Sequence, residues 1–231
     1  PARRLAGSAR TVKAMILAAG LGTRMRPLTD HTPKPLLTAG GKSLIEWHIE
    51  RLQQAGFREL VINTAWLGEK IEAALGDGSR YGVSIQWSRE GTPLETAGGI
   101  RRALPLLGDA PFAVINGDIW TDFDFARLRA PAGLAHLVLV TNPEHHPNGD
   151  FGLDSAGLVR DNGKPKLTFS GIGVYRPELF QELVDGEAKL APLLRAAMSH
   201  DAVSGEYFAG AWWDIGTPQR LEQLDAYLRG N

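Results

Sequence analysis

The chain has no cysteine among its 231 residues. This absence excludes disulfide bonds, thiolate catalysis and cysteine-based zinc sites. It is compatible with the reducing cytoplasm, where we expect the protein. No apolar run reaches the roughly 18 residues that a membrane-spanning helix needs, so we expect no membrane partner. Positive charge is not in excess either, because 25 Lys and Arg stand against 26 Asp and Glu. A protein that follows a nucleic-acid backbone needs such an excess, so nucleic acid is not an expected partner.

The composition is that of an ordinary globular protein, with 43% apolar and 22% charged residues. The length fits one large domain with a sizeable core. Residues 1–11 carry charge and small side chains but no apolar segment. We interpret them as an expression remnant or a disordered arm. Residues 12–231 are then expected to form a single domain, and the sequence does not indicate an oligomeric state.

The first half of the chain alternates strand and helix patterns. Short apolar runs typical of buried strands occupy 14–19, 59–65, 83–88 and 112–117, and helical periodicity occupies 43–56, 67–76 and 96–108. Ser43 and Glu46 predict a capping box for the first helix. Thr96 is expected to begin the third helix, and Pro105 to break it late. This alternation predicts a Rossmann-like, mostly parallel sheet with helices on both faces, and a nucleotide-binding half over about 12–122.

The second half, about 123–231, is less regular and would hold a different ligand over the same sheet edge. Its patterns predict strands over 134–142, 166–175 and 207–216, a hairpin over 152–163, and helices over 177–184 and 190–200. A last helix begins at Thr217, its expected N-cap, with Pro218 in the first helical position. The predicted class is therefore α/β with a mixed sheet.

The stretch "AAGLGTRMRPLTDHTPKP", from Ala18 to Pro35, follows the first predicted strand. Gly20 and Gly22 allow backbone N–H groups to approach an anion closely, and Arg24 adds a two-pronged donor. The prolines exclude a regular helix. Ligands bind at the carboxyl ends of strands in open α/β sheets, so a phosphate loop is one interpretation. A tight turn with solvated cations is the other.

Neither common phosphate fingerprint fits this loop. In the dinucleotide pattern Gly-x-Gly-x-x-Gly, Met25 stands where the third glycine belongs. The P-loop pattern requires Gly-Lys followed by Ser or Thr, which does not occur here. Glycine content alone therefore does not decide between the two interpretations.

The full spacing of the loop resembles the sugar nucleotidyltransferase family, whose members make nucleoside-diphosphate sugars. The matching residues are Gly20, Gly22, Thr23, Arg24, Pro27, Leu28, Thr29, Lys34, Pro35, Leu36 and Leu37. Five later segments match in the same order, namely "TPLETAGGI", "FAVINGDIWTD", "HHPNGDFGL", "DNGKPKLTFSGIGVY" and "WWDIGTP". The chain departs from the family at Glu95, where glycine is usual, and at Gly163, where glutamate is usual.

The resemblance implies a single-domain nucleotidyltransferase fold and a role for each matching residue. Arg24 and Lys34 are the implied catalytic residues, and Asp118 and Asp214 the implied Mg²⁺ ligands. The implied nucleotide-binding residues are Leu17, Ala19, Gly20, Gly22, Thr23, Glu90, Thr96 and Gly98. The implied sugar-phosphate-binding residues are Asn116, Asp150, Gly152 and Lys164. The substrates would be a nucleoside triphosphate and a sugar 1-phosphate, with pyrophosphate released.

Several assignments have alternatives at this point. Asp118 also fits a turn residue after glycine, Lys164 a surface lysine with Lys166 as its rival, and Thr96 a helix N-cap. Adjacent His145 and His146 are expected to be exposed loop residues and not metal ligands. The resemblance is nearest to uridylyltransferases of bacterial cell-wall recycling, which implies UTP as the donor. Guanylyltransferases and thymidylyltransferases are the alternatives, and a non-catalytic nucleotide-sugar sensor is the alternative of another class.

Overall fold

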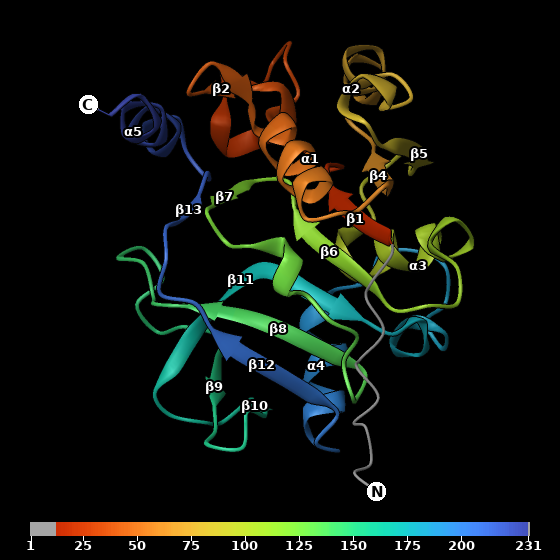
Figure 1. Cartoon of the computed structure of the whole chain (residues 1–231), viewed down its shortest axis with the longest axis vertical. Helices are drawn as coiled ribbons and strands as arrows, with labels where there is room; N and C mark the ends of the chain where they lie inside the picture. Colours follow the sequence, from red (N-terminus) through yellow and green to blue (C-terminus); the bar gives the residue numbers. More distant parts are fainter. Residues whose placement is uncertain (1–12, 231) are drawn as a thin grey trace, which may run out of the picture.

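The predicted parallel strands lie side by side in the computed structural model, which describes residues 13–230 (Figure 1). The interpretation of residues 1–11 falls outside this range. Strand β1 (Lys13–Leu17) pairs in parallel with β4 (Glu59–Thr64) and with β6 (Phe112–Asn116), and β4 pairs in parallel with β5 (Ser84–Arg89). The carboxyl ends of β1 and β6 therefore meet at one sheet edge, where loops can build a ligand site.

The second half of the chain continues the same sheet. Strand β11 (Lys166–Tyr175) runs antiparallel to β6, and β8 (Ala135–Val140) lies between β11 and β12 (Val203–Tyr207). Strand β9 (Phe151–Leu153) pairs with the start of β11 and with β10 (Val159–Arg160). The mixed sheet of the predicted α/β class is confirmed. The two halves of the chain form one continuous hydrogen-bonded sheet, joined where β11 pairs with β6.

A bulge in β11 lies opposite the end of β6. The register shifts between Phe169 and Ile172, where Gly171 has a φ of 81°. A Cβ atom on Gly171 would lie 2.7 Å from the side-chain amide of Asn116, so only glycine leaves room for that side chain. The bulge thereby lets the end of β6 and the middle of β11 approach each other.

Helices cover both faces of the sheet, as predicted. Helices α1 (Leu44–Gln54) and α2 (Gly68–Leu75) pack on the face that carries Ala14 and Ile16, whereas α3 (Glu95–Leu107) and α4 (Leu190–Met198) pack on the face that carries Met15. Successive residues of a strand point to opposite faces, so β1 contributes to two separate cores. The capping box of Ser43 and Glu46 is present at the start of α1.

A third apolar cluster joins the C-terminal helix to the glycine-rich loop. Helix α5 (Pro218–Arg229) lies beside the small hairpin of β2 (Thr38–Ala39) and β3 (Lys42–Ser43) (Figure 1). Met25 of the loop is buried in this cluster. Short strands β7 (Ile119–Thr121) and β13 (Trp212–Asp214) pair antiparallel and bring the chain from the sheet edge to α5.

Four local predictions differ from the structure. The expected strand 207–216 is not continuous: Tyr207 is the last residue of β12, which pairs with β8 in the main sheet, and only Trp212–Asp214 form β13, which pairs with β7 outside it. The expected helix 177–184 is one 3₁₀ turn, Pro177–Phe180, which ends where Phe180 docks in the core. Pro105 does not break α3, because it lies in the last turn and the helix continues to Leu107. The N-cap of α3 is Leu94 and not Thr96.

No helix within the described range is long and apolar enough to cross a membrane.

His48 is a buried titratable residue that the sequence analysis did not single out. Its side chain lies under β7, where Nε2 donates a hydrogen bond of 2.8 Å to the carbonyl oxygen of Ile119. Burial disfavours the charged imidazolium and lowers the pKa of His48 to about 4. The neutral ring therefore supports the strand that follows Asp118.

We expect His48 to make the fold sensitive to acid. The unfolded chain takes up this proton near pH 6.5, but the folded chain does so only near pH 4, so stability falls as pH falls through that window. The loss is on the order of 3 kcal/mol in full. His48→Gln should flatten the dependence of the unfolding free energy on pH between 7 and 5, as measured by urea denaturation. An unchanged slope would contradict the prediction.

Candidate functional site

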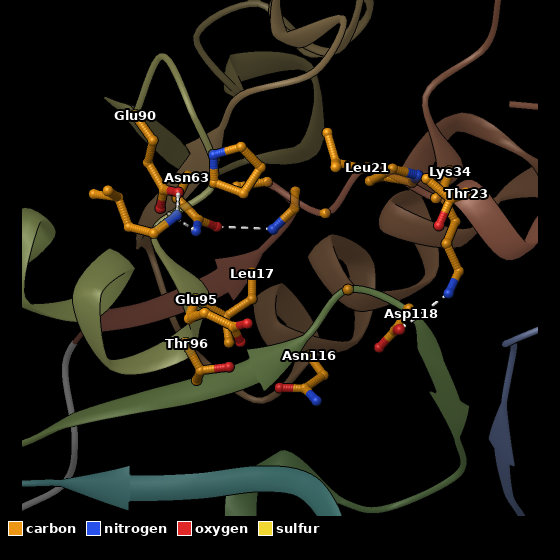
Figure 2. A pocket seen from close by; sticks show the side chains of 18 of the residues that line it. Leu17, Leu21, Thr23, Lys34, Asn63, Glu90, Glu95, Thr96, Asn116 and Asp118 are labelled. Atoms are coloured by element: carbon orange, nitrogen blue, oxygen red, sulfur yellow. Dashed lines mark hydrogen bonds and ion pairs between the residues drawn. The ribbon is translucent and has the colours of Figure 1, made fainter. Parts of the chain in front are cut away.

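A cavity of about 570 Å³ opens at the carboxyl ends of β1 and β6. Figure 2 shows the glycine-rich loop on one side, the start of α3 on another, and the turn after β6 below. Eleven of the predicted site residues line this cavity: Leu17, Ala19, Gly20, Gly22, Thr23, Arg24, Lys34, Glu90, Thr96, Asn116 and Asp118. Tertiary structure thus collects residues that are up to about a hundred positions apart in the chain.

The glycine-rich loop turns back on itself at Gly22. This residue has a φ of 63°, and its carbonyl oxygen accepts a hydrogen bond of 2.7 Å from Thr29 Oγ1. A Cβ atom on Gly22 would lie 3.0 Å from Thr29 Cγ2 and 3.4 Å from Lys34 Cβ. Met25, which occupies the third-glycine position of the dinucleotide pattern, anchors the turn in the third apolar cluster. The loop therefore presents Arg24 and Lys34 to the same cavity although ten positions separate them.

An ion pair closes one end of the cavity. Lys34 Nζ lies 3.0 Å from Asp118 Oδ2, and the two side chains point toward each other across the cavity in Figure 2. The lysine side chain is 11% exposed, whereas that of Asp118 is 43% exposed. Lys34 is thus held in place by the fold, while Asp118 keeps an accessible carboxylate face.

A polar pair at the other end holds the backbone after β1. Asn63 Oδ1 accepts a hydrogen bond of 2.8 Å from Ala18 N–H, and Asn63 Nδ2 donates one of 2.7 Å to Glu90 Oε1 (Figure 2). Glu90 Oε2 also accepts from Leu94 N–H at 3.0 Å. Burial raises the pKa of Glu90 above its ordinary value. Asn63 was not among the predicted site residues. Its position, as a polar residue near the end of a buried strand, could have indicated it.

The start of α3 places Glu95 and Thr96 at the cavity wall. Glu95 has a φ of 60°, in the left-handed region that favours glycine, which explains why glycine suits this position. Gly98 does not line the cavity. A Cβ atom there would lie 2.2 Å from the carbonyl oxygen of Gly186, so Gly98 permits close packing of the segment that brings Glu187 to the cavity.

The second predicted carboxylate, Asp214, lies beside Asp118 but outside the cavity lining. Ile215 N–H donates a hydrogen bond of 2.9 Å to the carbonyl oxygen of Asp118, and Asp214 pairs with Ile119 across β13 and β7. Asp214 Oδ2 accepts from Arg220 Nη1 at 2.7 Å and from His145 Nε2 at 2.9 Å. Asp118 and Asp214, far apart in sequence, thus lie on backbone segments that are hydrogen-bonded neighbours.

These two carboxylates fit a magnesium site. No cluster of three or more His, Asp or Glu side chains suited to a metal occurs among residues 13–230, so a metal at Asp118 and Asp214 would need further ligands from substrate and water. Mg²⁺ prefers one or two carboxylates with phosphate oxygens and water in its other positions. Each carboxylate also has a resident cation partner, Lys34 or Arg220, which a metal would have to compete with.

The remaining residues predicted for the sugar phosphate lie apart from the cavity lining. Asp150 is fixed by hydrogen bonds from Phe169 N–H and from His146 Nε2. Gly152 packs on Gly163, since a Cβ atom on Gly152 would lie 2.4 Å from the Gly163 carbonyl carbon. Lys164 is exposed. The Gly152–Gly163 contact gives a structural reason for glycine at the position where the family has glutamate.

Both histidines are loop residues with exposed side chains, as expected, and each also has a carboxylate partner. Their side chains are 39% and 41% exposed, yet His145 contacts Asp214 and His146 contacts Asp150. The sequence contained no signal for these contacts, because their partners lie on distant or folded-back segments. Of the rival lysines, Lys166 donates to the Asp150 carbonyl oxygen at 3.1 Å.

Comparison with known proteins gives consistent matches along the whole described chain. The family model described as nucleotidyl transferase matches residues 13–229. An N-acetylmuramate alpha-1-phosphate uridylyltransferase from Neisseria meningitidis is 57% identical over 225 residues, covering 93% of this chain and 97% of the relative. One from Caulobacter vibrioides is 37% identical, covering 93% and 96%.

A solved structure has the same fold. A Bacillus anthracis protein assigned as a glucose-1-phosphate thymidylyltransferase superposes with a TM-score of 0.83, covering 95% of this chain and 96% of that one, at 22% identity.

Proposed function

The chain belongs to the nucleotidyl transferase family, and we propose that it transfers a uridylyl group from UTP to N-acetylmuramate 1-phosphate, releasing pyrophosphate. The observation that carries this proposal is the 57% identity to a uridylyltransferase of that specificity over nearly its whole length. N-acetylmuramate is a sugar of bacterial peptidoglycan, so the reaction would return it to a nucleotide-activated form. UTP is a cytoplasmic metabolite, which supports the cytoplasm as the compartment.

The chemistry requires charge neutralisation and alignment more than an activated side chain. The nucleophile is a phosphate oxygen of the sugar 1-phosphate, which is already anionic at neutral pH. It attacks the α-phosphorus of UTP, a new P–O bond forms, and the bond to the β-phosphate oxygen breaks. The main barrier is the approach of one anion to another, so positioned cations and backbone donors supply the catalysis.

The two loop cations, Arg24 and Lys34, would each bind different phosphate groups of the triphosphate. Arg24 is exposed on the cavity wall and has a planar guanidinium suited to two phosphate oxygens. We assign it to the β- and γ-phosphates, where it stabilises the leaving pyrophosphate. Lys34, fixed by its ion pair with Asp118, lies near the α-phosphate. The backbone N–H groups around Gly20 and Gly22 would follow the phosphate chain.

Asp118 and Asp214 would hold Mg²⁺. The positive charge of the ion held by these carboxylates would neutralise phosphate oxygens of the substrates. The ends of β6 and β13 position these carboxylates on neighbouring backbones. Lys34 balances the charge of Asp118 from the loop side.

The opposite end of the cavity would receive the nucleoside. Asn63 and Glu90 fix the backbone at Ala18 and at Leu94, so they shape both walls of this end. Thr96, at the start of α3, offers a hydroxyl to the same space. Asn116 lies farther along the floor of the cavity (Figure 2), where it would face the acceptor sugar.

A substrate panel tests the proposal. The protein is incubated with Mg²⁺, each nucleoside triphosphate in turn and several sugar 1-phosphates, and pyrophosphate is measured. We expect release with UTP and N-acetylmuramate 1-phosphate. Release confined to GTP with mannose 1-phosphate, or to a thymidine triphosphate with glucose 1-phosphate, would replace this specificity. Failure with every pair would favour a non-catalytic sensor.

We expect Arg24→Ala to lower kcat by about two orders of magnitude or more, because a lost charge clamp on the leaving group costs about 3 kcal/mol. Steady-state pyrophosphate release measures this effect. Arg26→Ala is a matched control, since Arg26 is an exposed loop arginine that does not line the cavity and pairs with Asp30. An Arg24 variant with the rate of the control would remove the assigned role.

Asp214→Asn should weaken the response to magnesium, because it removes one of two anionic donors. The concentration of Mg²⁺ at half-maximal rate should rise about tenfold or more, and direct Mn²⁺ binding should weaken in parallel. Asp225→Asn serves as the control, since Asp225 lies on α5 and caps Gly40 N–H away from the cavity. Identical Mg²⁺ titrations of the Asp214 variant and the unchanged protein would contradict the metal role.

A further inference from the structure

Two side chains from distant elements converge on one oxygen of Asp214. Arg220, in the first turn of α5, places Nη1 2.7 Å from Asp214 Oδ2. His145, in the loop between β8 and β9, places Nε2 2.9 Å from the same atom. Arg220 Nη1 and His145 Nε2 are 3.1 Å apart. A carboxylate oxygen only accepts hydrogen bonds, so both side chains present donors to it.

This cluster lies against the cavity wall. Gly216 lines the cavity, and a Cβ atom on Gly216 would lie 2.9 Å from Arg220 Nη1 and 3.2 Å from Asp214 Oδ1. The guanidinium therefore packs directly on backbone that faces the cavity. Glycine at 216 leaves room for the guanidinium to pack in this position.

Arg220 has donors to spare. A guanidinium carries five N–H groups, and within the described residues the side chain of Arg220 donates, through Nη1, to the carbonyl oxygen and to Oδ2 of Asp214. The side chain is 21% exposed, so it is oriented by Asp214 and still reachable by solvent. A guanidinium fixed on one side and open on the other is suited to bind a phosphate or a carboxylate with two parallel hydrogen bonds.

We propose that Arg220, assisted by His145, binds an anionic group of the acceptor sugar 1-phosphate. This inference rests on the proposed function. Arg24 and Lys34 lie on the loop wall with the triphosphate, whereas Arg220 and His145 come from the C-terminal half, on the side of Asp214. The acceptor offers two anions, its phosphate and, in N-acetylmuramate, the carboxylate of the lactyl ether. Both have the planar or tripodal oxygen array that a guanidinium binds.

The loop of His145 connects this cluster to the sugar side of the second half. Five positions after His145, Asp150 is fixed by His146 and by Phe169 N–H. The loop is therefore held at both ends, by Asp214 and by Asp150. This makes His145 a positioning residue that keeps the loop against Asp214 and Arg220.

The test compares acceptors that differ in one anion. KM and kcat are measured at saturating Mg²⁺ and UTP for N-acetylmuramate 1-phosphate and for N-acetylglucosamine 1-phosphate, which lacks the carboxylate. An acceptor that is not turned over is measured as a competitive inhibitor. The variants are Arg220→Gln, Arg220→Lys and His145→Gln. Arg229→Gln is the control, because Arg229 pairs with Asp225 at the far end of the same helix. Thermal melting confirms that each variant folds.

We define the acceptor constant as KM for an acceptor that is turned over and as the inhibition constant for one that is not. We expect Arg220→Gln to raise this constant about tenfold or more, as for a lost hydrogen bond to a charged group. KM for UTP should stay near that of the control. Arg220→Lys should restore part of the affinity, and His145→Gln should show a smaller effect in the same direction. If the acceptor constant rises for both acceptors, Arg220 binds the phosphate. If it rises for N-acetylmuramate 1-phosphate alone, Arg220 binds the carboxylate.

An unchanged acceptor constant for both sugars would overturn the inference. A purely structural role of Arg220 through Asp214 would instead raise the Mg²⁺ requirement and lower kcat without moving the acceptor constant, and this outcome also counts against it. If the unaltered protein processes neither acceptor, the proposed function itself fails, which the wild-type measurement shows separately.

Discussion

The ion pair between Lys34 and Asp118 ties the two halves of the candidate site together. Lys34 ends the glycine-rich loop, and Asp118 ends the turn after β6, so their contact fixes the loop over the sheet edge. The backbone of Asp118 in turn accepts a hydrogen bond from Ile215, which brings β13 and Asp214 alongside. This junction brings the loop lysine, both carboxylates and the C-terminal segment to one edge of the sheet.

The apolar clusters explain why this junction is well placed. Two cores fix the sheet between its helix layers, and the third fixes Met25 of the loop against Leu221 and Leu224 of α5. The loop is thus packed on the same helix that carries Arg220. Burial of one methionine in the middle of a glycine- and proline-rich segment is what gives an otherwise irregular loop one conformation.

Each of the two carboxylates at the site has a positively charged side chain beside it. Lys34 faces Asp118, and Arg220 faces Asp214, so each carboxylate suited to a metal has a cation beside it. Such pairing lowers the cost of placing like charges on neighbouring backbones. It also leaves Arg24 on the loop wall and the other N–H groups of Arg220 without a protein partner among the described residues.

Much of this arrangement could be predicted from the order of residues. Alternating apolar runs and helical periodicity determined the parallel part of the sheet, because burial patterns are local. The family resemblance carried by the spacing from Gly20 to Lys34 implied a phosphate-binding loop, and the same resemblance implied roles for Asp118 and Asp214. Contacts between distant segments could not be predicted in this way. The break between β12 and β13 after Tyr207, the packing of Gly98 on Gly186, and the meeting of His145, Asp214 and Arg220 depend on where the folded chain returns, and only tertiary structure decided them.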